Sequence, residues 1–159
     1  MASTRGRARS QRRGRGDGGV ALVEFAIVAP IFFLLVFGIM EFGWAFYQHL
    51  DVRHGAREGA RLAAVNYKST ASPSPADQVQ EIVDELCSRM DQGTTDIDVQ
   101  ITRSGAAVGD ELTVHVTKDL DTLTGFFDSM IADIDLDESV TSRLEQPATW
   151  ESMTTAVSC

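Results

Sequence analysis

FAIVAPIFFLLVFGIM, residues 25–40, is the stretch on which the fold depends, because it holds no charge and only one helix breaker, Pro30. With its apolar flanks it extends over residues 20–47, long enough for an α-helix rising about 1.5 Å per residue to cross about 30 Å of hydrocarbon. A buried core helix is the alternative, but a chain of 159 residues with 43% hydrophobic composition hardly supplies a domain large enough to cover it. We therefore expect residues 20–47 to form one transmembrane helix.

This helix separates two segments of opposite charge. Residues 1–19 hold six arginines and one aspartate, a net charge of +5, whereas residues 51–159 hold eight basic and twenty acidic residues, a net charge of −12. The positive-inside rule predicts a basic cytoplasmic leader at 1–19, a single pass through the cytoplasmic membrane, and an acidic domain outside. A nucleic-acid arm has no reason to abut a membrane span, and a secretory signal would have a shorter apolar core and a small-residue exit site, so we expect neither.

Helical character continues past the membrane. Residues 48–65 contain no proline and favour helix, which predicts a helical stalk continuous with the anchor, and Pro30 permits a kink within the anchor. The stalk carries small residues at four-residue spacing, which let another backbone approach closely. The partner is either a second helix of the same domain or a neighbouring subunit. The small residues are Ala56, Ala60 and Ala64, beside Gly55, Gly59 and Ala63.

Residues 66–159 are predicted to form a small extracytoplasmic α+β domain. A second helix starts with Ser74 as N-cap and Pro75 in the first turn, and we expect it to end at Gly93. Its apolar residues recur at helical spacing: Val79, Ile82, Val83, Leu86 and Met90. Alternating apolar residues predict strands around 97–101 and 112–116, with a hairpin linker at 104–110, and a third strand is expected at 136–144. Residues 120–131 are expected as a short helix or packed loop. The helix would cover one face of an antiparallel sheet, whose other face is solvated.

Two acids border the membrane segment. Glu41 precedes Phe42, Trp44 and Tyr47, and we interpret it as an ordinary boundary acid at the headgroup level, within an aromatic belt. Glu24 lies close to the inner edge of the hydrocarbon, where a carboxylate is costly unless it reaches the interface or meets a cation.

No catalytic, cofactor or metal motif is recognisable, so we expect a non-enzymatic protein without cofactor or metal. The three histidines, His49, His54 and His115, do not follow a metal-ligand spacing. Asp133, Asp135 and Asp137 resemble the start of a calcium loop, but Glu138 and Leu144 stand where that loop requires Gly and Glu. A solvated strand face or turn is the interpretation we favour there.

The two cysteines, Cys87 and Cys159, both lie outside the membrane in this topology. An oxidising compartment favours a disulfide between them, with free thiols or an intermolecular bridge as the alternatives.

The N-terminal region resembles that of TadE-like proteins, minor pseudopilins of the Tad (Flp-type, type IVb) pilus system. The resemblance covers residues 15–65. It rests on Gly19-Val20-Ala21-Leu22-Val23-Glu24-Phe25, Pro30, Phe42-Gly43 and Ala56-Arg57-Glu58-Gly59-Ala60-Arg61.

This resemblance implies a pilin-like fold and cleavage by a prepilin peptidase between Gly19 and Val20. It further implies that Glu24 pairs with the amine of Val20 exposed by cleavage, within the chain or across a subunit contact, and so sets the register of assembly, with Pro30 part of the same assembly region. The implied partners are the membrane, other pilin or pseudopilin subunits, the prepilin peptidase and the Tad secretion machinery. The alternative function is a membrane-anchored extracytoplasmic binding or sensor module that never enters a pilus.

Overall fold

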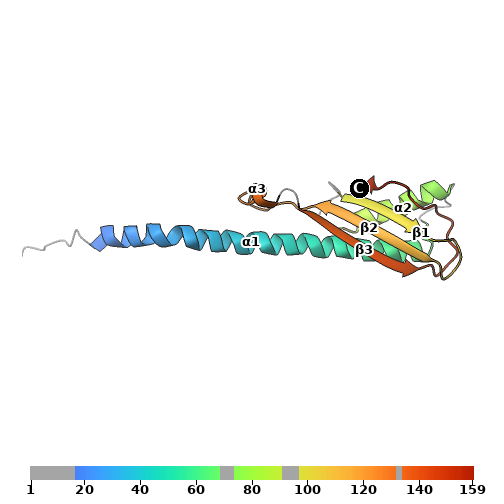
Figure 1. The fold of residues 1–159 in the computed structure, drawn as a ribbon, viewed down its shortest axis with the longest axis horizontal. Helices are drawn as coiled ribbons and strands as arrows, with labels where there is room; N and C mark the ends of the chain where they lie inside the picture. The colour runs from blue at the N-terminus through green and yellow to red at the C-terminus, as the bar shows by residue number, and fades with distance from the viewer. Residues whose placement is uncertain (1–16, 69–73, 91–96, 132–133) are drawn as a thin grey trace, which may run out of the picture. The chain divides into compact units, whose positions relative to one another are not determined.

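The computed structural model describes residues 17–68, 74–90, 97–131 and 134–159. The chain divides into two compact units, residues 1–38 and 39–159. The elements follow one another in the order α1 (Asp17–Ala64), α2 (Pro75–Ser88), β1 (Ile97–Arg103), β2 (Glu111–Asp119), α3 (Asp128–Ile131), β3 (Asp135–Arg143) and β4 (Val157–Ser158) (Figure 1). The fold is α+β, with a long N-terminal apolar helix, a second helix and a small antiparallel sheet, as the sequence predicts.

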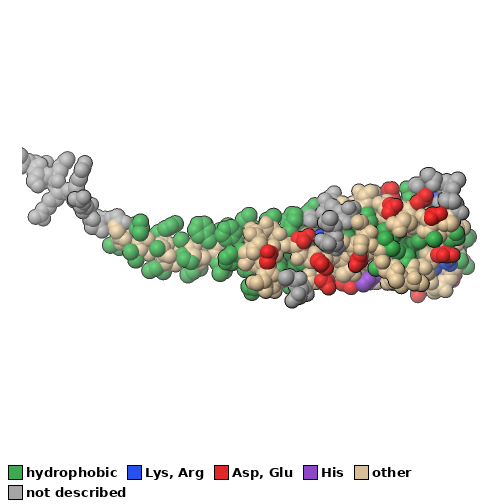
Figure 2. Space-filling model, turned by 90° about the horizontal axis from the view of Figure 1, so that it is seen from above, with side chains coloured by type: hydrophobic (Ala, Val, Ile, Leu, Met, Phe, Trp, Pro, Cys, Tyr) green, Lys and Arg blue, Asp and Glu red, His purple; other side chains and the backbone are tan. Residues whose placement is uncertain are grey.

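The first unit contains the N-terminal part of α1. The most apolar window of this helix has a mean hydropathy of 2.7, and none of it is buried within the chain. Its surface is covered by hydrophobic side chains, whereas acidic side chains are spread over the domain (Figure 2). Pro30 lies inside the helix without ending it. A helix this long, apolar and uncovered fits a single-pass membrane anchor.

Helix α2 begins as predicted and ends earlier than predicted. The Oγ of Ser74 accepts a hydrogen bond from the backbone N–H of Asp77 at 3.1 Å and so caps the helix. The expected end at Gly93 is wrong, because α2 ends at Ser88, and Gly93 itself lies outside the described residues. The backbone N–H of Arg89 bonds to the carbonyl of Leu86, three residues back, so the last turn tightens before the apolar periodicity is exhausted.

The sheet has the strand order β3-β2-β1-β4, and every adjacent pair is antiparallel. The β1–β2 hairpin aligns Ile101 with Val114 and Val99 with Val116, so its apolar residues share one face. The strands predicted at 97–101, 112–116 and 136–144 are all present, the third as β3 from Asp135 to Arg143. In β2 the residues alternate between buried and half-exposed, which agrees with a sheet solvated on its other face.

The core of the second unit lies between the C-terminal part of α1, α2 and the inner face of the sheet. The small residues of α1 point into this core, and Ala56, Ala60 and Ala63 are buried there. A Cβ atom placed on Gly59 would lie 2.3 Å from Cδ1 of Leu86 in α2 and 3.2 Å from Cγ1 of Val114 in β2. Of the two partners left open by the sequence, the chain's own domain therefore covers the small-residue stripe.

The segment between β2 and β3, which we call the β2–β3 loop (residues 120–131), differs from expectation in its packing. It contains the short helix α3, as one of the two predicted forms. Its apolar side chains are only partly covered, however: Leu120, Phe127 and Ile131 are half-buried, whereas Leu123, Phe126 and Met130 are 48%, 62% and 75% exposed. The loop lies beyond the end of the strands, where α1, α2 and the sheet no longer enclose a core.

Candidate functional site

The residues that the sequence links to processing and assembly all lie on α1. Val20 and Glu24 are four residues apart in the helix, so their side chains lie on one face, a turn from each other. Pro30 lies on the same helix, more than one turn further along, and is not brought next to them. Gly19, Val20 and Glu24 are all exposed, and Glu24 is the only charged residue between Gly18 and Met40. The arrangement offers one carboxylate on an otherwise apolar helix surface.

Glu41 has a role that sequence reasoning missed. Its side chain is buried, with 7% exposure, and it contacts the β2–β3 loop. Oε1 accepts a hydrogen bond from the backbone N–H of Leu123 at 2.8 Å, and Oε2 accepts bonds from the backbone N–H and the hydroxyl of Thr124 at 3.2 Å and 2.8 Å. The carboxylate therefore fixes the loop to α1, in addition to its place next to the apolar stretch.

Gln48 makes a second attachment two helical turns further along the same face. Its Nε2 donates to the carbonyl of Asp121 at 2.7 Å, and its Oε1 accepts from the backbone N–H of Asp121 at 3.1 Å. The carboxylate of Asp121 in turn accepts a bond of 2.8 Å from Nζ of the buried Lys118. We call Glu41 and Gln48 the α1 clamp. In the sequence, the only indication of this clamp is that two polar residues, Glu41 and Gln48, are seven residues apart just after the apolar stretch.

Trp44 lies between the two clamp residues on this face of α1. Its ring packs against that of Tyr47 with a centroid distance of 5.6 Å. Within the part of the chain that the structure describes, its indole Nε1 is the buried side-chain nitrogen or oxygen that has no hydrogen-bond partner. The aromatic residues Trp44 and Tyr47 therefore lie beside the attachment of the loop.

A charged cluster joins α1 to α2 further along α1 than the clamp. Glu58 accepts hydrogen bonds from Arg61 Nε at 2.9 Å and Nη2 at 2.5 Å, and also pairs with Arg89 of the α2 C-cap. Arg89 further pairs with Glu85 at 2.5 Å. The hydrogen bond from Arg61, together with the charges of both guanidinium groups, lowers the pKa of Glu58, and burial opposes this only in part. The cluster favours the ionised carboxylate.

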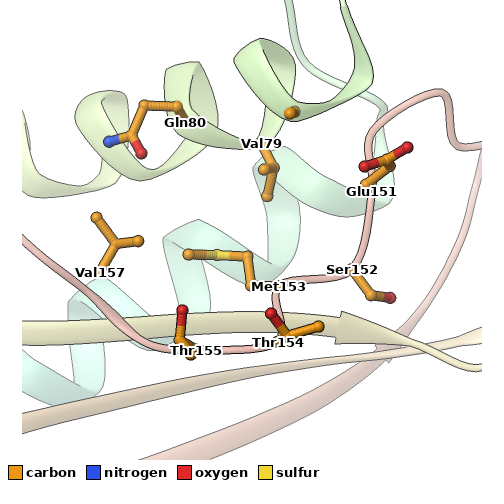
Figure 3. Close-up of a pocket in the computed structure, with 9 residues that line it drawn as sticks. Val79, Gln80, Glu151, Ser152, Met153, Thr154, Thr155 and Val157 are labelled. Atoms are coloured by element: carbon orange, nitrogen blue, oxygen red, sulfur yellow. The ribbon is translucent and has the colours of Figure 1, made fainter.

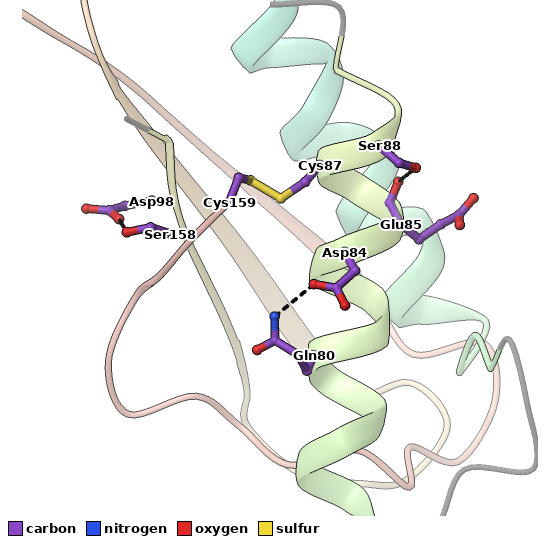
Figure 4. The surroundings of a disulfide bond; sticks show 8 residues. All are labelled: Gln80, Asp84, Glu85, Cys87, Ser88, Asp98, Ser158 and Cys159. Carbon is purple, nitrogen blue, oxygen red and sulfur yellow. Dashed lines mark hydrogen bonds between the residues drawn. A yellow bond between two sulfur atoms is a disulfide. The ribbon is translucent and has the colours of Figure 1, made fainter. Parts of the chain in front are cut away.

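Cys87 of α2 and Cys159 are joined by a disulfide in the structure, with a Cα–Cα distance of 5.8 Å (Figure 4). The bond holds the C-terminal segment against α2 and next to β1. Two hydrogen bonds support this position: the backbone N–H of Cys159 donates to the carbonyl of Ile97 at 2.9 Å, and Ser158 Oγ donates to Asp98 at 2.6 Å.

The other candidate groups offer little chemistry. His115 is a partly exposed strand residue 2.8 Å from Asp137, and Asp135 and Asp137 lie exposed on β3, as the favoured strand interpretation predicts. Asp133 lies outside the described residues. Across those that are described, no group of three or more His, Cys, Asp or Glu side chains is placed to hold a metal ion.

A shallow pocket of about 220 Å³ lies between α2 and the C-terminal segment (Figure 3). Val79, Met153 and Val157 point toward its centre, while Glu151 lies at its edge. Its lining combines aliphatic and hydroxyl side chains and brings no acid–base pair together.

Comparison with known proteins bears on the N-terminal region. Residues 19–61 match the family model described as TadE-like protein. The match begins at the predicted cleavage glycine, covers the apolar stretch and the α1 clamp, and ends three residues before the end of α1. No curated protein and no solved structure matches the chain. From Gly19 to Arg61, this chain is therefore similar to TadE-like proteins.

Proposed function

We propose that the protein is a minor pseudopilin that acts in the assembly of a Tad pilus and is cut by a prepilin peptidase between Gly19 and Val20. The observation that carries the proposal is the match of residues 19–61 to the TadE-like family model, on a helix whose apolar surface is left uncovered by the chain itself. Such a surface has to be covered by lipid or by neighbouring helices. A pilus subunit meets both, because it is anchored in lipid before assembly and packed against other subunits afterwards.

The charge distribution supports an orientation with the N-terminus in the cytoplasm. Residues 1–19 carry a net charge of +5, and residues 51–159 carry −12. Basic segments beside a membrane span are retained on the cytoplasmic side. The acidic domain is then outside, where disulfide formation between Cys87 and Cys159 is favoured.

The proposal explains why a carboxylate, that of Glu24, lies on the apolar helix. A carboxylate beside hydrocarbon is unfavourable unless it has a partner. Cleavage after Gly19 creates a positive amine at Val20, one helical turn from Glu24 on the same face. The carboxylate pairs with this amine in the same chain or in a neighbouring subunit.

Processing is tested with Gly19→Leu, using the mass of the mature chain extracted from membranes. A Cβ on Gly19 would have no atom within 4 Å, so the substitution leaves the fold intact and any loss of cleavage reflects peptidase recognition. Gly38→Leu is the matched control, because Gly38 lies in the same helix and is equally open. We expect the wild type and Gly38→Leu to begin at Val20, and Gly19→Leu to keep its leader.

A wild-type chain that retains residues 1–19 in cells with an active prepilin peptidase would contradict the proposal. That result would favour an anchored binding or sensor module that is not incorporated into a pilus.

A further inference from the structure

The β2–β3 loop forms an apolar patch on the second unit. Its largest exposed side chains, Leu123, Phe126 and Met130, all come from this one short segment. The rings of Phe126 and Phe127 pack edge to face at 5.0 Å, which gives the patch a defined shape. Clustered apolar side chains of this kind mark interaction sites, unlike the single exposed residues that most domains carry.

The α1 clamp fixes where this patch lies along the helix. The backbone N–H groups of Leu123 and Thr124 donate to Glu41 at 2.8 Å and 3.2 Å, and Gln48 holds Asp121 two turns further on. Glu41 directly follows Met40, the last residue of the uncharged stretch. Since one residue advances a helix by about 1.5 Å, the loop is attached at the end of the uncharged stretch, within the last turns of the expected transmembrane helix.

We propose that the β2–β3 loop is a second membrane contact, whose exposed apolar side chains enter the interface of the bilayer that holds α1. Amphipathic segments dock in this way by placing apolar side chains at the boundary between headgroups and acyl chains. Trp44 and Tyr47, side chains of the types enriched at membrane interfaces, lie on α1 beside the attachment. The inference does not depend on processing or on entry into a pilus.

The charges around the loop indicate which lipids it meets. Asp119 directly precedes the loop and Asp128 lies within it, and the carboxylate of Asp121 is already paired with Lys118. The loop supplies no Lys or Arg to attract anionic headgroups. Contact through apolar side chains with zwitterionic lipid is therefore favoured, and anionic lipid adds nothing.

The test is site-specific photo-crosslinking of the full chain reconstituted in phosphatidylcholine vesicles. Phe126→p-benzoylphenylalanine places the photoprobe on the patch. Val108→p-benzoylphenylalanine is the control, because Val108 is as exposed, at 61%, but lies in the β1–β2 turn. In that turn, the backbone N–H of Gly109 donates to the carbonyl of Leu144, and the next residue, Glu145, donates to the carbonyl of Ala64. The turn therefore lies near the C-terminal end of α1, away from the α1 clamp. We expect a lipid adduct at position 126, identified by mass, and none at position 108.

The clamp is tested in the same vesicles by adding Glu41→Ala, which removes the acceptor for both loop N–H groups. We expect the adduct at position 126 to fall several-fold while the Cys87–Cys159 bond, checked by peptide mapping, reports that the domain is folded. Equal lipid adducts at positions 126 and 108, no lipid adduct at 126, or a crosslink from 126 to a second copy in place of lipid would overturn the proposal.

Discussion

At Gly59, α1 packs so closely on the domain that a side chain has no room. A Cβ there would lie 2.3 Å from Leu86 Cδ1, well inside van der Waals contact, and both neighbours are buried. Gly59→Ala is therefore expected to lower the free energy of unfolding by about 1–3 kcal/mol, even though alanine favours helix. Thermal unfolding in detergent, followed by near-UV circular dichroism, measures the change.

Gly55→Ala is the matched control for this prediction. Its Cβ would meet the thioether end of Met90 at 2.7 Å, and that flexible end can move aside. A smaller loss of stability is expected than for Gly59→Ala. Equal stability of Gly59→Ala and the wild type would show that the helices are not in such close contact.

Glu58 makes stability depend on pH. Its folded-state pKa is lowered below the ordinary 4.5 by the hydrogen bond from Arg61 and by both guanidinium charges. The stabilisation is complete above the ordinary pKa and is lost as the pH falls through the lowered one. Glu58→Gln should therefore cost about 0.5–1 kcal/mol at neutral pH, as for other partly exposed ion-pair networks, and the difference from the wild type should shrink below pH 4.5.

Glu85→Gln is the comparison variant, since it removes only the pair with Arg89. Its effect at neutral pH should be smaller than that of Glu58→Gln. A stability difference for Glu58→Gln that grows on acidification would contradict the assigned direction of the pKa change.

Single residues also mark the limit of what the sequence reveals. The N-cap Ser74 is readable because its partner Asp77 is three residues away. The contacts of Glu41 cannot be predicted in this way, because its partners lie more than eighty residues further along the chain. A carboxylate beside an apolar stretch also has an ordinary explanation as a residue at the membrane boundary. Local patterns predict local contacts, whereas long-range hydrogen bonds require the topology.

Among the elements, β4 depends most on a covalent bond, since it has only two residues and pairs only with β1. The Cys87–Cys159 bridge closes a sequence separation of 72 residues, which the chain-entropy model values at about 4 kcal/mol. Replacing both cysteines by serine should reduce stability by up to that amount and remove hydrogen-exchange protection from β4 first. Ser158→Ala, which removes only the bond to Asp98, is the control.

Non-reducing peptide mapping checks the bridge directly in the native chain. Recovery of a linked peptide containing Cys87 and Cys159 is the expected result. Alkylation of both thiols in folded protein, or a linked pair formed between two chains, would contradict it.

The elements themselves were largely predictable, for a physical reason. Helical periodicity predicted α2 and alternating periodicity predicted β1 and β2, because each buries one continuous face, whereas α1 was predicted from its long uncharged apolar stretch. The β2–β3 loop was predicted only in part, since its apolar composition suggested packing, whereas Leu123 and Met130 are exposed. Composition indicates which side chains are apolar, but it does not indicate whether they are covered by the chain's own core, by lipid or by another protein.

At the scale of the whole molecule, the prediction with the widest effect concerns Glu24. The amide of Glu24→Gln keeps the shape of the side chain and removes its charge, so cleavage and membrane insertion should continue while assembly of pili is impaired. Val28→Gln is the control, because it places the same amide one turn along the exposed face and leaves Glu24 intact. Electron microscopy of the two strains measures the outcome.

Normal pili in the Glu24→Gln strain would remove the electrostatic part of the mechanism. Equal impairment by Val28→Gln would attribute the defect to an added polar group in the membrane and not to the lost charge.

The sheet of this molecule also constrains how copies can meet. β3 is an edge strand, and it carries Asp135, Asp137 and Glu138 along its length, with Arg143 at its end. Charged edges oppose the addition of a strand from another chain, because like carboxylates would be brought into register. This edge of the sheet is thereby protected from backbone pairing with another chain, so we expect contacts between copies to use other surfaces.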